Sequence, residues 1–272
     1  MGGVHFIESG AGPPLVLLHA FPVDARMWNR ARALLEEHAR VITPDQRGLG
    51  ESPLDGGSAH TLAPPSRRPV EAPSVAAAAA DVLALLDTLD LREVLLGGCS
   101  MGGYVAMAVL RAAPERVAGL LLADTKAAAD DEAQRENRLQ AADRATREGT
   151  DGWLAEGMLP NVLGRTTHAE RPEVVAEIRD MITTQPPEGV AWAQRAMAAR
   201  PDSSAELRAF HRPALVVVGE EDVVTPPEAA AELADLLPDA DFVRVPSAGH
   251  LSPVENPDAF AEAAVRWINR VV

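Results

Sequence analysis

The stretch that decides the fold is residues 97–103, Gly-Gly-Cys-Ser-Met-Gly-Gly, which joins the apolar run at 94–96 to the helix-like stretch Tyr104–Ala113. It contains the pattern Gly-x-Ser-x-Gly in a strand–turn–helix setting, which is typical of a nucleophile elbow. Such a turn strains the backbone of its serine and projects the hydroxyl from the edge of a sheet. The two glycines of the pattern lack a Cβ where strand and helix nearly touch. Ser100 is therefore the first candidate nucleophile.

The composition is that of a globular protein with a sizeable core. The chain has 272 residues, of which 47% are hydrophobic and 24% charged, enough for one large α/β domain with an appendage. The formal net charge of −15 argues against DNA or RNA as a partner, because phosphate binding needs a basic face. Cys99 is the single cysteine, so no intrachain disulfide can form.

The N-terminal stretch Met1–Ile7 lacks both the cationic start and the long apolar segment of a signal peptide. No apolar stretch reaches the roughly 18–20 residues that a membrane-spanning helix requires. These features predict a soluble, cytoplasmic protein with no membrane partner.

Strand-like and helix-like segments alternate along the chain, which predicts a mostly parallel sheet covered by helices on both faces. The candidate strands are Val4–Glu8, Leu15–Leu18, Arg40–Thr43, Glu93–Leu96, Val117–Ala123, Ala214–Val218 and Asp241–Val245. The candidate helices are Met27–Glu37, Val75–Leu89, Gly102–Ala113, Pro227–Leu237 and Pro257–Val271.

Two segments interrupt this alternation. Residues 51–74 are rich in Pro, Gly and Ser and predict a long loop. Residues 126–210 hold no convincing strand and predict three to five short helices, interrupted at Pro160, Pro172, Pro186-Pro187 and Pro201. We therefore expect a core domain of residues 1–125 and 211–272, with residues 126–210 inserted as a helical cap.

A serine nucleophile needs a base within hydrogen-bond reach, and that base needs an acid to orient it. Of the seven histidines, His250 is the best candidate base. It ends the stretch Ser247–His250, which follows the last predicted strand and precedes the last helix. This places it at the sheet edge where Ser100 is expected.

Two aspartates compete for the role of the acid. Asp222 follows the apolar strand that ends at Val218, and Asp124 follows the strand Val117–Ala123. We favour Asp222, because Asp124 could equally cap the turn that follows it. Glu221, beside Asp222, is read as a solvated loop charge.

An oxyanion hole requires two backbone N–H groups aimed at the carbonyl oxygen of the substrate. Met101, directly after the nucleophile, supplies one candidate. The loop His19-Ala20-Phe21-Pro22 after the second strand supplies the other. There the Phe21 N–H is the best candidate, because proline has none.

These features together resemble the α/β-hydrolase superfamily: the order Ser100…Asp222…His250, the elbow, the loop at 19–22 and the stretch Pro44–Ser52. The stretches Cys99–Gly103, Asp222…Thr225-Pro226-Pro227 and Gly249-His250…Glu255-Asn256-Pro257 are similar to those of small esterases, enol-lactonases and cofactor-free haloperoxidase-type perhydrolases. The resemblance implies an eight-stranded, mostly parallel sheet with the active site between core and cap. Ala20 departs from the family pattern, which has glycine there.

Other residues complete the interpretation. Cys99 is expected to be a buried small side chain. The apolar residues of the predicted cap include Trp153, Met158 and Trp192, which we expect to line the substrate pocket. No metal-binding or nucleotide-binding motif occurs in the sequence, so neither a metal nor a cofactor is expected.

The sequence therefore predicts a serine hydrolase that cleaves an ester, lactone or thioester of a small, mainly apolar molecule through an acyl-enzyme. The same residues would also serve perhydrolysis, acyl transfer, lactone formation or C–C bond cleavage. A non-catalytic, ligand-binding member of the superfamily is the more distant alternative. The sequence leaves the exact substrate and the oligomeric state open.

Overall fold

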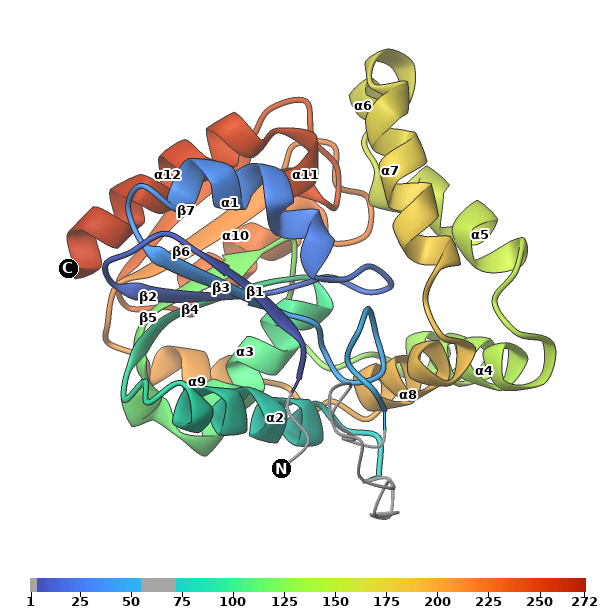
Figure 1. Ribbon diagram of the computed structural model, residues 1–272, viewed down its shortest axis with the longest axis horizontal. Helices are drawn as coiled ribbons and strands as arrows, with labels where there is room; N and C mark the ends of the chain where they lie inside the picture. The colour runs from blue at the N-terminus through green and yellow to red at the C-terminus, as the bar shows by residue number, and fades with distance from the viewer. Residues whose placement is uncertain (1–3, 55–71) are drawn as a thin grey trace.

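The computed structural model describes residues 4–54 and 72–272, so most of the loop predicted at 51–74 lies outside the described residues. A single sheet runs through the centre of the molecule in the order β1-β3-β2-β4-β5-β6-β7 (Figure 1). The strands are β1 (Phe6–Ser9), β2 (Pro14–Leu18), β3 (Arg40–Pro44), β4 (Val94–Cys99), β5 (Val117–Ala123), β6 (Ala214–Gly219) and β7 (Ala240–Val245). Only β1 pairs antiparallel, with β3.

The prediction of eight strands is wrong, because the described residues form a sheet of seven strands. The eighth strand was implied by the family resemblance alone, whereas the seven apolar runs of the sequence correspond to the seven strands. Beyond them, the long apolar segments of residues 4–54 and 72–272 are helical. No segment is therefore left there to extend the sheet.

Helices cover both faces of the sheet, as the sequence predicted (Figure 1). On one face, α12 (Pro257–Val271) packs against α1 (Asn29–Leu35), next to the short α11 (Ser252–Glu255). On the other face, α2 (Val75–Thr88) packs against α3 (Met101–Ala112). A further helix, α10 (Pro227–Asp235), packs on β6 and β7. The buried rings of Trp28 and Phe260, 5.8 Å apart, anchor the α1–α12 layer in the core.

Five helices between β5 and β6 stand apart from the sheet, at the right of Figure 1, and are called the outer helices below. They are α4 (Glu132–Glu148), α5 (Trp153–Val162), α6 (Arg165–Glu170), α7 (Pro172–Thr183) and α8 (Pro187–Ala198). Two pairs pack together, α4 with α8 and α5 with α7. The short α9 (Ser204–Arg208) follows them and packs instead against α3 of the central layer.

The helix prediction for residues 126–210, which are all described, was too low, since six helices occur there rather than three to five. One of the six, α4, is 17 residues long rather than short. Pro160 does not interrupt a helix but lies inside the last turn of α5, where proline removes only one hydrogen bond close to the helix end. Pro172 and Pro187 instead begin α7 and α8, where a missing N–H costs nothing.

The sheet places the candidate residues at one edge. Strands β4, β6 and β7 belong to the parallel part of the sheet, so their carboxyl ends lie at the same side. Ser100 directly follows β4, whereas Asp222 and His250 lie in the loops after β6 and β7. Loops at the carboxyl edge of a parallel sheet are where such folds bind ligands.

Candidate active site

Ser100 sits in a strained turn between β4 and α3. Its φ is 52° and its ψ is −112°, in the left-handed half of the map that non-glycine residues rarely occupy. The chain is tightly packed around it. A Cβ on Gly98 would lie 2.2 Å from the carbonyl of Gly102, and one on Gly102 would lie 2.1 Å from the Leu18 oxygen. The two glycines of the motif are therefore required by space, and the turn they permit presents the hydroxyl of Ser100.

The three predicted side chains form a continuous hydrogen-bonded chain. The Ser100 Oγ lies 2.8 Å from His250 Nε2, and His250 Nδ1 lies 2.8 Å from Asp222 Oδ2. A carboxylate can only accept, so Nδ1 carries the proton and Nε2 is left to accept from the serine hydroxyl. This is the tautomer that a general base toward Ser100 needs.

Burial and neighbouring charge act in opposite directions on His250. Burial disfavours the imidazolium, but the charge and hydrogen bond of Asp222 outweigh it, and the pKa of His250 is raised above 6.5. Asp124 and Glu255 add to the increase. The site thus stabilises the imidazolium that forms when His250 takes a proton.

Asp222 is held rigidly by the loop that follows it. Its Oδ1 accepts from the backbone N–H groups of Val224 and Thr225, at 2.8 and 2.9 Å. Its Oδ2 accepts from the Thr225 hydroxyl at 2.8 Å. With the bond to His250, both oxygens are occupied, which fixes the orientation of the carboxylate.

The competing acid, Asp124, is also buried at this edge but does not bond to His250. Its Oδ1 accepts from the Gly219 N–H at 2.9 Å, and its Oδ2 accepts from the N–H and hydroxyl of Ser252 at 3.0 and 2.7 Å. Burial and the nearby charge of Asp222 raise the pKa of Asp124 to about 8. The geometry therefore favours Asp222 as the acid and gives Asp124 a different task, joining the end of β6 to the His250 loop.

The sequence predicts that the backbone N–H groups of Phe21 and Met101 form an oxyanion hole. Within residues 4–54 and 72–272, neither Phe21 nor Met101 donates its backbone N–H to another group. Met101 begins α3, where an N–H has no partner inside the helix. The assignment of these two amides as the oxyanion hole stays a prediction, since no anion marks the position.

His19 steadies the loop that carries Phe21. Its Nδ1 donates to the Ala20 carbonyl at 2.8 Å, and its Nε2 accepts from the Gln46 N–H at 2.8 Å. This arrangement requires a neutral ring, and burial lowers the pKa of His19 accordingly. Ala20 is buried and is not among the residues with positive φ. Alanine in place of the family's glycine therefore imposes no backbone strain.

Comparison with known proteins agrees with this geometry. A family profile described as alpha/beta hydrolase fold matches residues 13–257. The chain belongs to the α/β-hydrolase fold family. Among solved structures, an esterase from Thermogutta terrifontis is 41% identical, with a TM-score of 0.89, covering 98% of this chain and 93% of that one.

Two further solved structures match this α/β-hydrolase. The enol-lactonase from Burkholderia xenovorans LB400 is 30% identical, with a TM-score of 0.84 over 98% of this chain and 96% of that one. A bromoperoxidase from Bacillus anthracis is 20% identical, with a TM-score of 0.81 over 98% of this chain and 95% of that one, and shares the fold. The resemblance to esterase and enol-lactonase members is thus confirmed, and the bromoperoxidase shows the same fold.

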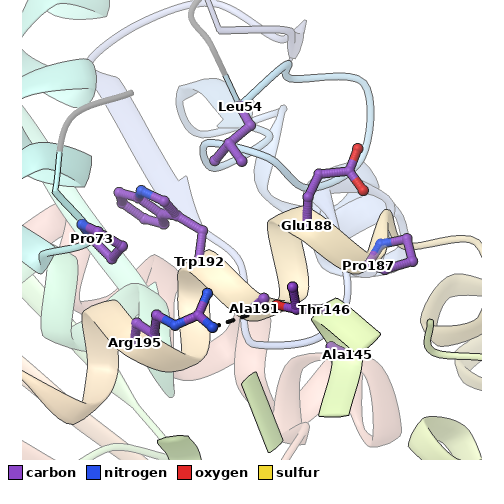
Figure 2. A pocket seen from close by; sticks show the side chains of 9 residues that line it. All are labelled: Leu54, Pro73, Ala145, Thr146, Pro187, Glu188, Ala191, Trp192 and Arg195. Atoms are coloured by element: carbon purple, nitrogen blue, oxygen red, sulfur yellow. Dashed lines mark hydrogen bonds between the residues drawn. The ribbon is translucent and has the colours of Figure 1, made fainter. Parts of the chain in front are cut away.

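Trp192 of this α/β-hydrolase lies between a surface hollow and a small internal cavity. The hollow, about 380 Å³, opens between α4, α8 and the residues at 54 and 73. Figure 2 shows the Trp192 indole extending from α8 between Leu54 and Pro73. The internal cavity is lined by Trp192 together with Met101 and Met197. Trp192 therefore separates the hollow from the internal cavity, and that cavity extends to Met101, the residue next to Ser100.

The other two predicted pocket residues lie elsewhere on the outer helices. Trp153 donates its indole N–H to the Gly149 carbonyl at 2.8 Å, and the Arg144 guanidinium lies 4.5 Å from its ring centre. Met158 is half-buried on α5. Neither residue lines the hollow or the internal cavity that Trp192 separates, and their role in the pocket stays a prediction.

Some polar residues near the site were not assigned from the sequence. Gln46 holds His19 through two hydrogen bonds, and Glu255 is a buried carboxylate beside His250. Glu221 was wrongly interpreted as a solvated charge, because its side chain is only 9% exposed and accepts from the N–H and hydroxyl of Thr166. Its position close to the end of a predicted strand was the signal in the sequence that could have indicated a buried role for Glu221.

Cys99 is fully buried, as expected, and burial raises the pKa of its thiol well above the usual value. It is therefore an inert core side chain. In the described part of the chain, no three His, Cys, Asp or Glu side chains come close enough to hold a metal ion. None of the described helices is long and apolar enough to cross a membrane.

Proposed function

We propose that this α/β-hydrolase is a serine hydrolase that cleaves an ester, lactone or thioester of a small, mainly apolar molecule. The observation that carries the proposal is the chain of two 2.8 Å hydrogen bonds from Ser100 through His250 to Asp222. The fold family and the similarity to an esterase and an enol-lactonase support the same type of bond.

The geometry supports a two-step mechanism. His250 takes the proton of Ser100 as Oγ attacks the substrate carbonyl, and Asp222 stabilises the imidazolium. The amides of Phe21 and Met101 stabilise the developing oxyanion, each by roughly 3–4 kcal/mol if they resemble known donors. His250 then protonates the leaving alcohol or thiol, and the same imidazole activates a water that releases the acid.

The outer helices form the cap of the proposed site. Two of their contacts support this: Gly164, at the start of α6, touches Gly249 beside His250, and α8 supplies Trp192 and Met197 to the cavity that reaches Met101. This cavity, only about 10 Å³, is lined mainly by apolar side chains, with Gln46 and Arg47 as its polar members and with methionines that adapt to different shapes. An apolar acyl or alcohol group suits such a surface better than a charged one.

The test is reaction with a fluorophosphonate, followed by measurement of intact mass, with Ser100→Ala as the control. We expect one adduct on the wild-type protein and none on the variant, because only an activated serine next to an oxyanion hole reacts. Kinetics with p-nitrophenyl esters of increasing acyl length and with a panel of lactones would then define the substrate class. A wild-type protein that takes no adduct and hydrolyses none of these compounds would contradict the proposal and favour a ligand-binding role.

A further inference from the structure

Glu255, the last residue of α11, is a buried carboxylate with four hydrogen-bond donors around it. Its side chain takes no part in the proposed chemistry, and the residue is only 3% exposed. Its Oε1 accepts from the N–H groups of Gly249 and Leu251, at 2.9 and 3.2 Å. Its Oε2 accepts from the Gly164 N–H and the Thr167 hydroxyl, at 2.7 and 2.6 Å. One carboxylate thus joins two separate segments.

The first segment is the loop that carries His250. Gly249 and Leu251 are its two chain neighbours, so the peptide is held on both sides of the residue whose ring must reach Ser100. Charge-assisted bonds of this kind are stronger than those between neutral groups. They restrict the rotation of the backbone at His250, and with it the direction of the imidazole.

The second segment is the start of α6, one of the outer helices. It packs directly on the His250 loop: a Cβ on Gly249 would lie 2.4 Å from the Gly164 nitrogen. Arg171, just after α6, donates from Nη1 to the carbonyls of Glu255 and Ser247, at 2.5 and 3.2 Å. The outer helices and the His250 loop are therefore in contact, with Glu255 between them.

We propose that Glu255 is a positioning residue for His250, and that through it the start of α6 sets where the imidazole lies relative to Ser100. The proposal rests on the proposed function, since it takes His250 as the base toward Ser100. Glu255 bonds to the amides beside His250 and not to its ring, so it acts through the backbone.

Glu221 provides a matched control. It also holds the start of α6, accepting from the Thr166 N–H at 2.9 Å and the Thr166 hydroxyl at 2.6 Å. Its side chain contacts neither amide beside His250. Glu221→Gln therefore loosens the same helix without touching the His250 backbone, which isolates the role that Glu255 alone has.

The first experiment compares kcat and KM of Glu255→Gln, Glu221→Gln and the wild-type protein with a p-nitrophenyl ester. In Glu255→Gln an NH2 group replaces one carboxylate oxygen. Because both oxygens accept from donors, the two hydrogen bonds to the replaced oxygen are lost. We expect kcat to fall about 10- to 100-fold, the range for small misplacements of a reacting group, with little change in KM. Glu221→Gln should stay within about threefold of the wild-type protein. Equal kcat values for the two variants would overturn the proposal.

The second experiment follows the titration of His250 by NMR with ¹⁵N-labelled histidine. The ionisable groups that face His250 are Asp222 from the β6 loop, Asp124 from the end of β5, Glu255 from α11 and Cys99 from β4. The charge of Glu255 raises the pKa of His250, so Glu255→Gln should lower it and Glu221→Gln should not. An unchanged pKa in Glu255→Gln would show that the charge of Glu255 does not act on His250, and this outcome counts against the proposal.

The NMR titration requires no substrate, so it separates the two proposals. If the wild-type protein takes no fluorophosphonate adduct, the proposed function fails, yet the position and pKa of His250 still report on Glu255. If Glu255→Gln does not fold, Thr167→Val removes the hydroxyl bond from α6 to Glu255, together with the longer bond of 3.4 Å that Arg171 donates to the same hydroxyl. We then expect kcat to fall about threefold to tenfold at unchanged KM, about 1 kcal/mol for one hydrogen bond. A wild-type kcat for Thr167→Val would refute the link to α6.

Discussion

The carboxyl edge of the sheet and the outer helices are built in different ways. At the edge, Ser100, Asp222 and His250 each follow a strand, are buried, and bond to one another at 2.8 Å. The outer helices carry no strand and pack mainly in pairs, α4 with α8 and α5 with α7. The proposed catalytic residues thus follow strands of the central sheet, whereas the proposed substrate-binding surface belongs to a separate layer of helices.

Polar contacts join the outer helices to the rest of the molecule. Gln185 donates to Asp24 at 2.9 Å and accepts from the Gly50 N–H at 2.9 Å, and Arg30 pairs with Glu177 at 2.6 Å. The partly exposed Arg30–Glu177 ion pair contributes little stability. We therefore expect substitutions at the carboxyl edge to abolish activity, whereas substitutions in the outer helices should alter which substrate is accepted. Five predictions test this difference.

The largest effect is expected at the nucleophile. Ser100→Ala removes the attacking oxygen, and kcat should fall by about 10⁶, with at least three orders of magnitude required by the mechanism. Steady-state kinetics and the melting temperature of both proteins check this, since the fold should be unaffected. Turnover close to that of the wild-type protein would show that Ser100 is not the nucleophile.

The next effect is expected at the acid. Asp222→Asn should lower kcat by about 10⁴, because an amide can donate to His250 Nδ1 and so favours the wrong tautomer. Asp124→Asn, measured in parallel, should lower kcat far less, because Asp124 does not bond to His250. If Asp124→Asn instead shows the large loss of kcat and Asp222→Asn the small one, Asp124 is the acid.

The pH dependence of kcat/KM gives the third prediction. The pKa of His250 is raised above 6.5 by Asp222 against the effect of burial, and only the neutral ring can accept the Ser100 proton. Activity should therefore fall about tenfold per pH unit as the pH decreases below that raised pKa. A pH–rate profile between pH 5 and about 9 checks this. An acid limb placed below 6.5 would show that Asp222 does not control His250.

Most of the sheet could be predicted from the sequence, because buried parallel strands are continuous apolar runs. The seven runs gave the seven strands with ends correct to within three residues, the largest error being at the end of β4. The elbow was equally clear, since only glycine fits at Gly98 and Gly102. The ends of strands also located Ser100, Asp222 and His250 at one edge before any distance was known.

The remaining features depend on contacts between distant segments. Asp124 and Asp222 both follow strands, and only the fold shows which of them reaches His250. Glu255 lies five residues after His250, yet half of its bonds go to α6, about 90 residues away. No local pattern records such a contact. The number of helices in residues 126–210 was also missed, since six occur rather than three to five. Pro160 was taken as a break although it lies inside α5.

A smaller effect is expected for the stability of Asp124→Asn. The variant deprives the Ser252 N–H of an acceptor, and the free energy of unfolding at pH 6 should fall by about 1–3 kcal/mol. Burial and Asp222 raise the pKa of Asp124 to about 8, above its unfolded value. The native state therefore holds this proton while the unfolded state loses it, and wild-type stability should decrease between pH 4 and about 8. Urea unfolding should show a weaker decrease for the variant; equal slopes would contradict the raised pKa.

The smallest effect on chemistry is expected in the outer helices. Trp192→Ala should leave kcat for an acetyl ester within about threefold, because the hydrogen-bonded chain runs from Ser100 through His250 to Asp222 without Trp192. It should raise KM for a long acyl ester about tenfold, since loss of an apolar wall costs roughly 1–2 kcal/mol of contact. Trp153→Ala is the comparison, because Trp153 lies on α5 and lines neither the hollow nor the internal cavity. A KM series from acetate to octanoate separates the two variants. If Trp153→Ala raises KM as strongly, the pocket extends to α5; if neither variant does, the acyl group binds outside the outer helices.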